Sequence, residues 1–283
     1  MASVRRAVGG SNFGVAFRVL PPDQQKAIRA VHAFSRSVDD SVDEESNREV
    51  AREKIARWRR EIAACYEGTP TEPTALAMKP HLERFRIPRR YLEELLEGVE
   101  MDVTHQGYAT FSELRRYCYR VASVVGFICL RIFGDQEERG RSYAENLGLA
   151  LQLTNILRDV DSDRARGRIY IPAEDLRAFG YSEDALARRE RSAAFLALMR
   201  FQADRARAFF AAADREARSL DKRRLIAAEI MSRVYQRLLA RIEASGYDIW
   251  NGEVRVPLLE RAWIAGRTFL STGAARSAAG PIP

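Results

Sequence analysis

Apolar residues recur along most of this chain at intervals of three and four, the spacing that collects side chains on one face of a helix. Proline, glycine and capping residues divide the pattern into segments of helical length. The predicted helices lie at 22–43, in a stretch ending near 66, and at 75–85, 88–104, 110–134, 140–163, 190–218 and 222–245. Only RIYIP (168–172) and GEVRVP (252–257) are typical of extended or irregular chain. The pattern predicts an all-α protein.

The predicted helix at 140–163 carries a polar stripe, although most of its surface is apolar. The stripe has spacings of 3, 4 and 4, which place its members on one helix face: Gln152, Asn155, Asp159 and Asp163. Two carboxylates four residues apart repel by roughly 0.2–0.5 kcal/mol on an exposed helix, and by more when buried. A neighbouring positive charge is therefore expected.

Three interpretations compete for this stripe: a solvated charged face, a calcium loop and a magnesium site. A calcium loop needs glycine at its sixth position and glutamate at its twelfth, where this chain has Arg164 and Tyr170. Magnesium is commonly held by one or two carboxylates, retained waters and substrate phosphates. A second carboxylate cluster elsewhere would favour magnesium over the solvated face.

Such a cluster lies on the predicted helix at 22–43. Its members, at spacings of 4, 3 and 4, are His32, Arg36, Asp39 and Asp43. If the two helices face each other, their carboxylates form an anionic cleft that divalent cations would stabilise. The arginines beside the stripes are suited to a diphosphate, and they include Arg36, Arg158 and Arg168. The two stripes together predict a site for a metal and a diphosphate.

The predicted helix at 110–134 contains a group of small residues: Ala122, Ser123 and Gly126. Such a group is typical of close helix–helix packing. It is also expected in the wall of an apolar channel for a long hydrocarbon, with the Tyr117 hydroxyl at the mouth. The sequence alone leaves both interpretations open.

Composition excludes several other classes. The 283 residues show no linker and no repeat, which predicts one domain, and the net charge of +7 admits anionic partners. There is no nucleic-acid-binding motif, no paired-cysteine motif and no zinc spacing among the three histidines. No signal peptide or transmembrane segment is evident, which predicts a cytoplasmic protein with peripheral contact at the inner face of the membrane. Residues 1–10 and 271–283 are expected to be flexible.

Three long segments then resemble one family. DDSVDE (39–44), YCYRVASVVG (117–126) and LQLTNILRDVDSDRARGRIYIP (151–172) resemble, in this order, the motifs of the squalene/phytoene synthases. The resemblance runs from about Ser11 to Val256. It implies an all-α isoprenoid synthase fold, a single domain at 11–270 with helices around a central cavity. It also implies Mg²⁺ as cofactor, with Mn²⁺ as an alternative, and prenyl diphosphates as substrates.

The resemblance assigns roles by position. The implied metal and catalytic aspartates are Asp39, Asp43, Asp159 and Asp163, with Tyr117 managing a proton or cation. The implied substrate contacts are Phe13, His32, Arg36, Ala122, Val125, Gly126, Gln152, Asn155, Arg158, Arg168 and Tyr235. The chain departs from the family at His32, where a tyrosine is usual, and at Ser11, Asn12, Ser123 and Ser162. A histidine at position 32 would make a diphosphate contact sensitive to pH.

Within the family, the segment from Ser11 to Asp40 and VASVVG (121–126) are most similar to bacterial enzymes that make presqualene diphosphate for hopanoid biosynthesis. The expected reaction is the head-to-head condensation of two farnesyl diphosphates with release of diphosphate, without NADPH. The alternatives are a complete NADPH-dependent squalene synthase and a phytoene synthase that uses geranylgeranyl diphosphate. A rival from another class is a basic helical protein that binds lipid or nucleic acid, which would leave both aspartate stripes unexplained.

Overall fold

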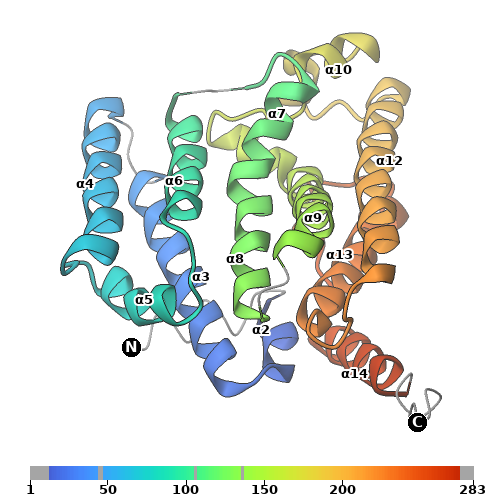
Figure 1. Cartoon of the computed structure of the whole chain (residues 1–283). Helices are drawn as coiled ribbons and strands as arrows, with labels where there is room; N and C mark the ends of the chain where they lie inside the picture. Colours follow the sequence, from blue (N-terminus) through green and yellow to red (C-terminus); the bar gives the residue numbers. More distant parts are fainter. Residues whose placement is uncertain (1–12, 44–46, 105–106, 135–136, 275–283) are drawn as a thin grey trace.

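The computed structural model describes residues 13–43, 47–104, 107–134 and 137–274 (Figure 1). Its helices are α2 (Phe13–Ala16), α3 (Pro22–Asp43), α4 (Arg48–Glu67), α5 (Pro73–Arg84), α6 (Arg89–Thr104), α7 (Phe111–Cys118), α8 (Val124–Ile132), α9 (Glu137–Ala165), α10 (Ala173–Ala178), α11 (Glu183–Ala187), α12 (Ala193–Glu216), α13 (Ile226–Ala244) and α14 (Leu258–Ala274). Strand pairing within these ranges is limited to one isolated parallel bridge between Gly107 and Ile169. The all-α prediction is confirmed.

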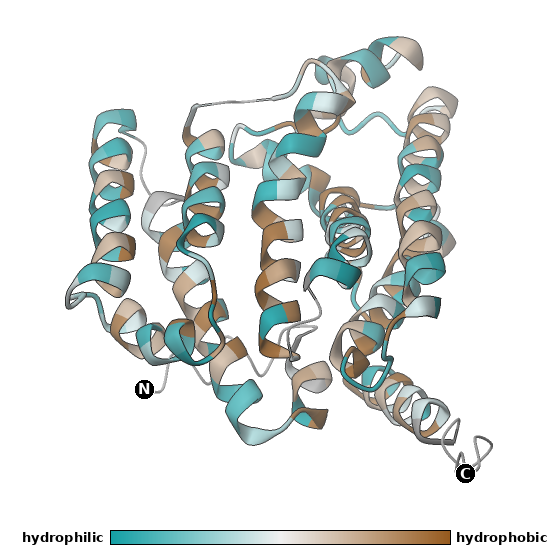
Figure 2. Cartoon of the chain, in the orientation of Figure 1, coloured by the Kyte–Doolittle hydropathy of each residue, from teal (hydrophilic) through white to brown (hydrophobic). Residues whose placement is uncertain are grey.

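The helices surround α9, which packs against α8, α12 and α13. Figure 1 shows α8 and α9 at the centre, with α3 to α6 on one side and α12 to α14 on the other. The apolar residues of α8 form a continuous band in Figure 2, as expected for a helix enclosed by its neighbours. The central position of α9 explains why its sequence is apolar on nearly every face outside the polar stripe.

Thr110 and Glu113 cap the start of the 110–134 segment. The Thr110 hydroxyl accepts a 3.3 Å hydrogen bond from the Glu113 backbone N–H. The Glu113 carboxylate accepts a 2.8 Å bond from the N–H of Ala109, the residue before the cap. These bonds satisfy donors that would be orphaned at a helix start. They fix the first turn of α7 and so the direction in which Tyr117 leaves the helix.

The periodicity predicted one uniform helix over 110–134, and this prediction is wrong. Between α7 and α8 the chain forms a π-helical segment, Tyr119–Ser123. This segment lies directly against α9, because a β-carbon added to Gly148 would come within 2.6 Å of the Ser123 α-carbon. The Ser123 hydroxyl also donates a 2.9 Å hydrogen bond to the Glu145 carbonyl. A π-helical turn inside a helix often accompanies a functional site, and here it adjoins the tyrosine at position 117.

Four of the described helices lie outside the predicted set, and the first of them is the single turn α2 before residue 22. The short helices α10 and α11 are too brief to give a periodic signal, and α14 begins directly after Pro257. The sequence pattern did not reveal α14 because it has apolar residues on more than one face. It continues to Ala274, into the tail expected to be flexible, and the remainder of that tail and residues 1–12 lie outside the described residues. None of the described helices is both long and apolar enough to cross a bilayer.

Candidate active site

A deep cavity lies between α3, α8, α9 and α13, and it gathers most of the residues singled out in the sequence. Of those residues, nine line it: His32, Arg36, Asp39, Ala122, Val125, Gly126, Gln152, Asn155 and Tyr235. They come from α3, the π-helical segment with α8 and α9 that follow it, and α13, which are three separate regions of the sequence. The tertiary structure therefore brings the two polar stripes and the small-residue wall to a single cavity.

This cavity is polar at one end and apolar at the other. Along α9 its wall runs from Tyr143 to Asn155, a distance of about 18 Å at 1.5 Å per residue. Arg36, Asp39 and Asn155 mark one end, and Phe17 and Phe133 belong to the apolar part of the wall. A cavity of this shape suits a ligand with an anionic head and a long apolar tail.

The small residues near position 122 line the cavity and also pack against α9, and their role beside a hydrocarbon stays a prediction. Ala122, Val125 and Gly126 face the cavity. Ser123 is fully buried, and Gly126 packs against α9, since an added β-carbon would lie 3.1 Å from the Ala144 carbonyl oxygen. The same turn thus provides a wall for the cavity on one side and close helix packing on the other.

Asp159 and Asp163 lie beyond Asn155, one and two turns further along α9. The positive charge expected near them is present in Arg158, whose guanidinium donates two hydrogen bonds to the Asp159 carboxylate at 2.7 and 2.5 Å. Arg166 lies 4.0 Å from Asp163. Burial and the neighbouring Asp159 charge raise the pKa of Asp163 to about 7. This carboxyl therefore lacks a strong cationic partner in the described structure.

The α3 stripe is described only in part. Arg36 and Asp39 both line the cavity, and Arg36 forms an exposed 3.2 Å ion pair with Asp40. The side chains of Phe13 and Asp43 lie outside the described residues. Burial and the nearby Arg36 charge lower the pKa of His32, so this histidine is neutral near pH 7. His32 would therefore become protonated only at a pH below the ordinary pKa of histidine.

The donor set fits a hard divalent cation that completes its shell with phosphate oxygens. Among the described residues no three metal-ligating side chains converge into a closed site. Magnesium does not require one, because it keeps waters and takes substrate phosphates as ligands. The Asn155 side-chain oxygen is buried and has no hydrogen-bond partner within the described chain, which leaves a hard oxygen donor available next to the carboxylates.

Tyr117 belongs to a buried cluster that the sequence did not reveal. Its hydroxyl donates a 2.8 Å hydrogen bond to Asp102, and the Tyr170 hydroxyl donates a 2.8 Å bond to the other oxygen of the same carboxylate. The two rings stack with centroids 5.3 Å apart. Burial and the Asp102 charge raise the pKa of both phenols far above the ordinary value. Both tyrosines are therefore neutral hydrogen-bond donors.

Asp102 links this cluster to the aspartate site. Its charge contributes to the raised pKa of Asp163, and the Arg168 charge acts on Asp163 in the opposite sense. The backbone N–H of Arg168 also donates a 3.0 Å hydrogen bond to the Asp163 carbonyl, which folds the extended segment after α9 back over the site. In sequence, Asp102 is one of several acids on α6, so no spacing set it apart.

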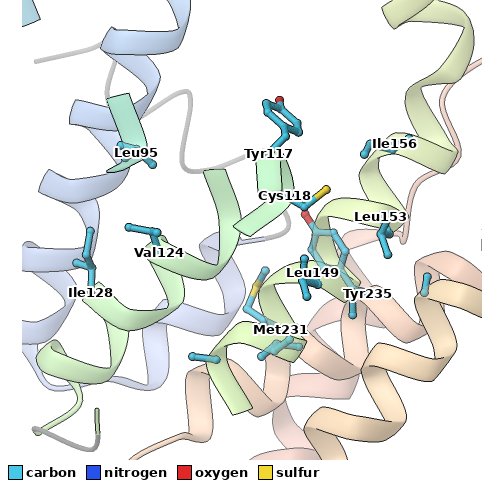
Figure 3. Packing of buried hydrophobic residues seen from close by; sticks show 14 of the residues in the cluster. Leu95, Tyr117, Cys118, Val124, Ile128, Leu149, Leu153, Ile156, Met231 and Tyr235 are labelled. Carbon is cyan, nitrogen blue, oxygen red and sulfur yellow. The ribbon is translucent and has the colours of Figure 1, made fainter. Parts of the chain in front are cut away.

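Tyr235 is buried on α13 and faces the same interior as Met231 and Leu153 (Figure 3). The Tyr235 phenol contributes to raising the pKa of the Arg158 guanidinium. Arg158 also lies 3.7 Å from Glu253, in the segment before α14. Arg158 thus connects α9 to the C-terminal part of the chain. The structure brings nine of the predicted residues to one cavity, and the roles of all the predicted residues remain predictions.

Comparison with known proteins agrees with the fold. The sequence model of the squalene/phytoene synthase family matches residues 7–261. The chain belongs to this family and is a prenyltransferase.

Its relatives carry two activities in their names. A phytoene synthase of Mycobacterium tuberculosis is 34% identical over 96% of this chain and 90% of its own length. A presqualene diphosphate synthase of Rhodopseudomonas palustris is 38% identical over 84% of this chain and 85% of its own. Among solved structures, a squalene synthase of Alicyclobacillus acidocaldarius superimposes with a TM-score of 0.78 at 28% identity, covering 87% of this chain and 94% of that one. A dehydrosqualene synthase superimposes with a TM-score of 0.86 at 24% identity over 96% of both chains, which supports the fold.

Proposed function

We propose that this protein condenses two molecules of farnesyl diphosphate head to head, giving presqualene diphosphate and releasing diphosphate. The observation that carries the proposal is one cavity with the Asp39 carboxylate and the Gln152 and Asn155 amides at one end and an apolar wall along the rest. Relatives named presqualene diphosphate synthase, at 35–38% identity, support this reaction. Phytoene synthases at 34% identity support the same chemistry on longer chains.

In the proposed reaction, four aspartates would hold the metal: Asp39, Asp43, Asp159 and Asp163, of which the side chain of Asp43 lies outside the described residues. Mg²⁺, when bound, withdraws charge from the diphosphate and so favours its departure. Gln152 and Asn155 orient the diphosphate next to the carboxylates. Arg158 adds positive charge for the departing anion.

The hydrocarbon part of the reaction takes place against the apolar wall. The allylic carbon–oxygen bond of one substrate breaks, and the 2,3-alkene of the second attacks the allylic cation. Loss of a proton then closes a cyclopropane ring. Ala122, Val125 and Gly126 keep water away from the cation, which water would otherwise quench. Since Tyr117 is protonated and bound to Asp102, it guides the proton, and the released diphosphate is the base.

We infer the shorter substrate from bulky side chains in the apolar wall of the cavity. Phe17, Phe133 and Tyr143 place three bulky rings in its apolar wall. They restrict the space for a C20 chain more than for a C15 chain. A phytoene synthase remains the second candidate function because relatives with that name align over as much of the chain.

The test is product analysis by mass spectrometry. Purified protein is incubated with Mg²⁺ and either farnesyl or geranylgeranyl diphosphate, each with and without NADPH. We expect presqualene diphosphate from the C15 substrate under both conditions. Squalene formed only with NADPH would show a complete squalene synthase. A C40 product from geranylgeranyl diphosphate, without a C30 product from the C15 substrate, would favour the phytoene reaction.

A further inference from the structure

The outer face of α14 carries most of the exposed large apolar side chains in the described part of the chain. Five of the seven belong to this helix: Leu258, Leu259, Trp263, Phe269 and Leu270. Leu259 is 85% exposed, Trp263 62% and Leu270 71%. The opposite face of α14 is occupied, because Ile264, Ala265 and Thr268 are buried against the rest of the molecule. The helix therefore has one apolar face inside and a second one in solvent.

Three of these five residues form a stripe together with an exposed glycine. Leu259, Trp263, Gly266 and Leu270 are spaced by 4, 3 and 4 and lie on one side of the helix. Figure 1 shows α14 at the edge of the molecule, where this side is accessible. Glu260 is the sole acid of α14, and two arginines from α13 bind it: Arg237 and Arg241. The outer stripe thus carries no carboxylate.

Positive charge lies next to this stripe. The Arg267 guanidinium lies over the Trp263 ring, 5.3 Å from its centre. A surface hollow beside the C-terminal half of α14 is lined by Phe269 and Thr272 together with Arg223 and Arg224. These two arginines follow Lys222 in an exposed basic run. Tryptophan and leucine beside exposed basic residues are typical of a helix that lies in the headgroup region of an anionic bilayer.

The same hollow adjoins the central cavity. Phe133 lines both of them, at the apolar part of the cavity wall. A molecule with low solubility in water would reach the α14 side of the protein if it left the cavity past the Phe133 ring. A bilayer covering α14 would receive it directly.

We propose that the outer face of α14, with the basic run Lys222–Arg224, docks this protein onto the surface of an anionic membrane. The occupant is the lipid headgroup and upper acyl region, and the helix lies in the plane of the bilayer without crossing it. A second copy of the chain fits less well, because the two basic runs would be brought toward each other in a symmetric contact. The proposal rests on the surface of α14 and does not depend on which prenyl diphosphate is condensed.

The test is flotation of the full-length protein with vesicles in the absence of substrate. Vesicles of phosphatidylcholine alone are compared with vesicles that also contain phosphatidylglycerol. We expect stronger binding to the anionic vesicles, weakened by salt. Replacing three exposed side chains, Leu259→Ser, Trp263→Ser and Leu270→Ser together, should lower the partition coefficient at least about tenfold. The control Leu76→Ser removes an exposed leucine from α5 and should leave binding unchanged.

Two further variants separate the apolar and charged contributions. Lys222→Glu with Arg223→Glu should reduce binding to anionic vesicles and leave the weaker binding to neutral vesicles unchanged. Trp263→Phe should keep binding but lose the blue shift of fluorescence on docking, because Trp58 is buried and Trp250 packs against Phe195.

Two results would overturn the proposal. One is an equal loss of binding in Leu76→Ser and in the triple variant. The other is absence of vesicle binding together with a concentration-dependent dimer that the triple variant abolishes, which would show that a second copy covers α14.

Discussion

The Tyr117 hydroxyl is held by Asp102 at 2.8 Å, which gives this buried tyrosine a fixed orientation and a fixed proton. The sequence placed Tyr117 at the mouth of the cavity, but it is not one of the residues that line the cavity. Its partner Asp102 comes from the end of α6, 15 residues earlier in the chain. Because Asp102 also accepts from Tyr170, one buried carboxylate positions two phenols beside the aspartate site. Four predictions follow from this arrangement and from the helices around it.

Asp102→Asn should reduce kcat about tenfold or more with a smaller change in KM, since a hydrogen bond to a charged group typically contributes about 1.5–3 kcal/mol. Tyr170→Phe is the matched control, because it removes the other bond to Asp102 and leaves the one from Tyr117 intact. Steady-state kinetics on both variants checks the assignment. An equal loss of kcat in the two would show that Tyr117 has no special role.

Asp159→Asn should abolish most turnover and leave the fold intact, because Asp159 is partly accessible and faces the proposed metal site. Asp161→Asn, two residues away, changes a carboxylate that pairs with Arg164 and Arg189 instead. Turnover measured against Mg²⁺ concentration should be near normal in Asp161→Asn. Near-normal turnover in Asp159→Asn, with circular dichroism unchanged, would refute its metal role.

The raised pKa of Asp163, about 7 against an unfolded value of 3.8, makes the metal-free protein sensitive to pH. A group whose pKa is higher in the folded state stabilises the protein when protonated, and this stabilisation is lost as the pH rises through the folded pKa. The contribution of Asp163 should therefore make the metal-free protein less stable as the pH rises from about 4 to about 7, and it should change little at higher pH.

Asp163→Asn should remove this part of the pH dependence and raise Tm above pH 7 by about 3 °C or more. The measurement is thermal unfolding in the presence of a chelator at several pH values. If Tm changes with pH in the same way in the variant and in the wild type, the pH dependence arises from other groups. Metal binding near neutral pH should also release protons, because the coordinating carboxyl must be ionised.

Gly148→Ala should destabilise the protein by about 1–3 kcal/mol, because the added methyl group meets the backbone of the π-helical segment at Ser123. Gly266→Ala is the control on α14, where nothing lies within 4 Å of the added carbon, and it should be neutral or stabilising by up to about 1 kcal/mol. Chemical denaturation of both variants provides the comparison. Equal stability of Gly148→Ala and the wild type would mean that the segment moves away from α9 at little cost.

The sequence by itself determined the helices and the chemistry that two of them carry. The period of three to four residues predicted α3, α9 and the segment around Tyr117, because a helix places such positions on one face. Like charges at positions 159 and 163 also predicted the nearby arginine, since repulsion within one helix is a local property. The resemblance to the family indicated which residues would share a cavity.

Only the tertiary structure decided what depends on contacts between distant segments. Asp102 meets Tyr117 and Tyr170 because α6, α7 and the segment after α9 converge, and no local pattern contains that information. The π-helical segment depends on the missing side chain of Gly148, which lies on another helix. The exposure of the outer face of α14 is also a tertiary property. This helix has two apolar faces, and only its packing against the rest of the molecule decides which of them stays in solvent.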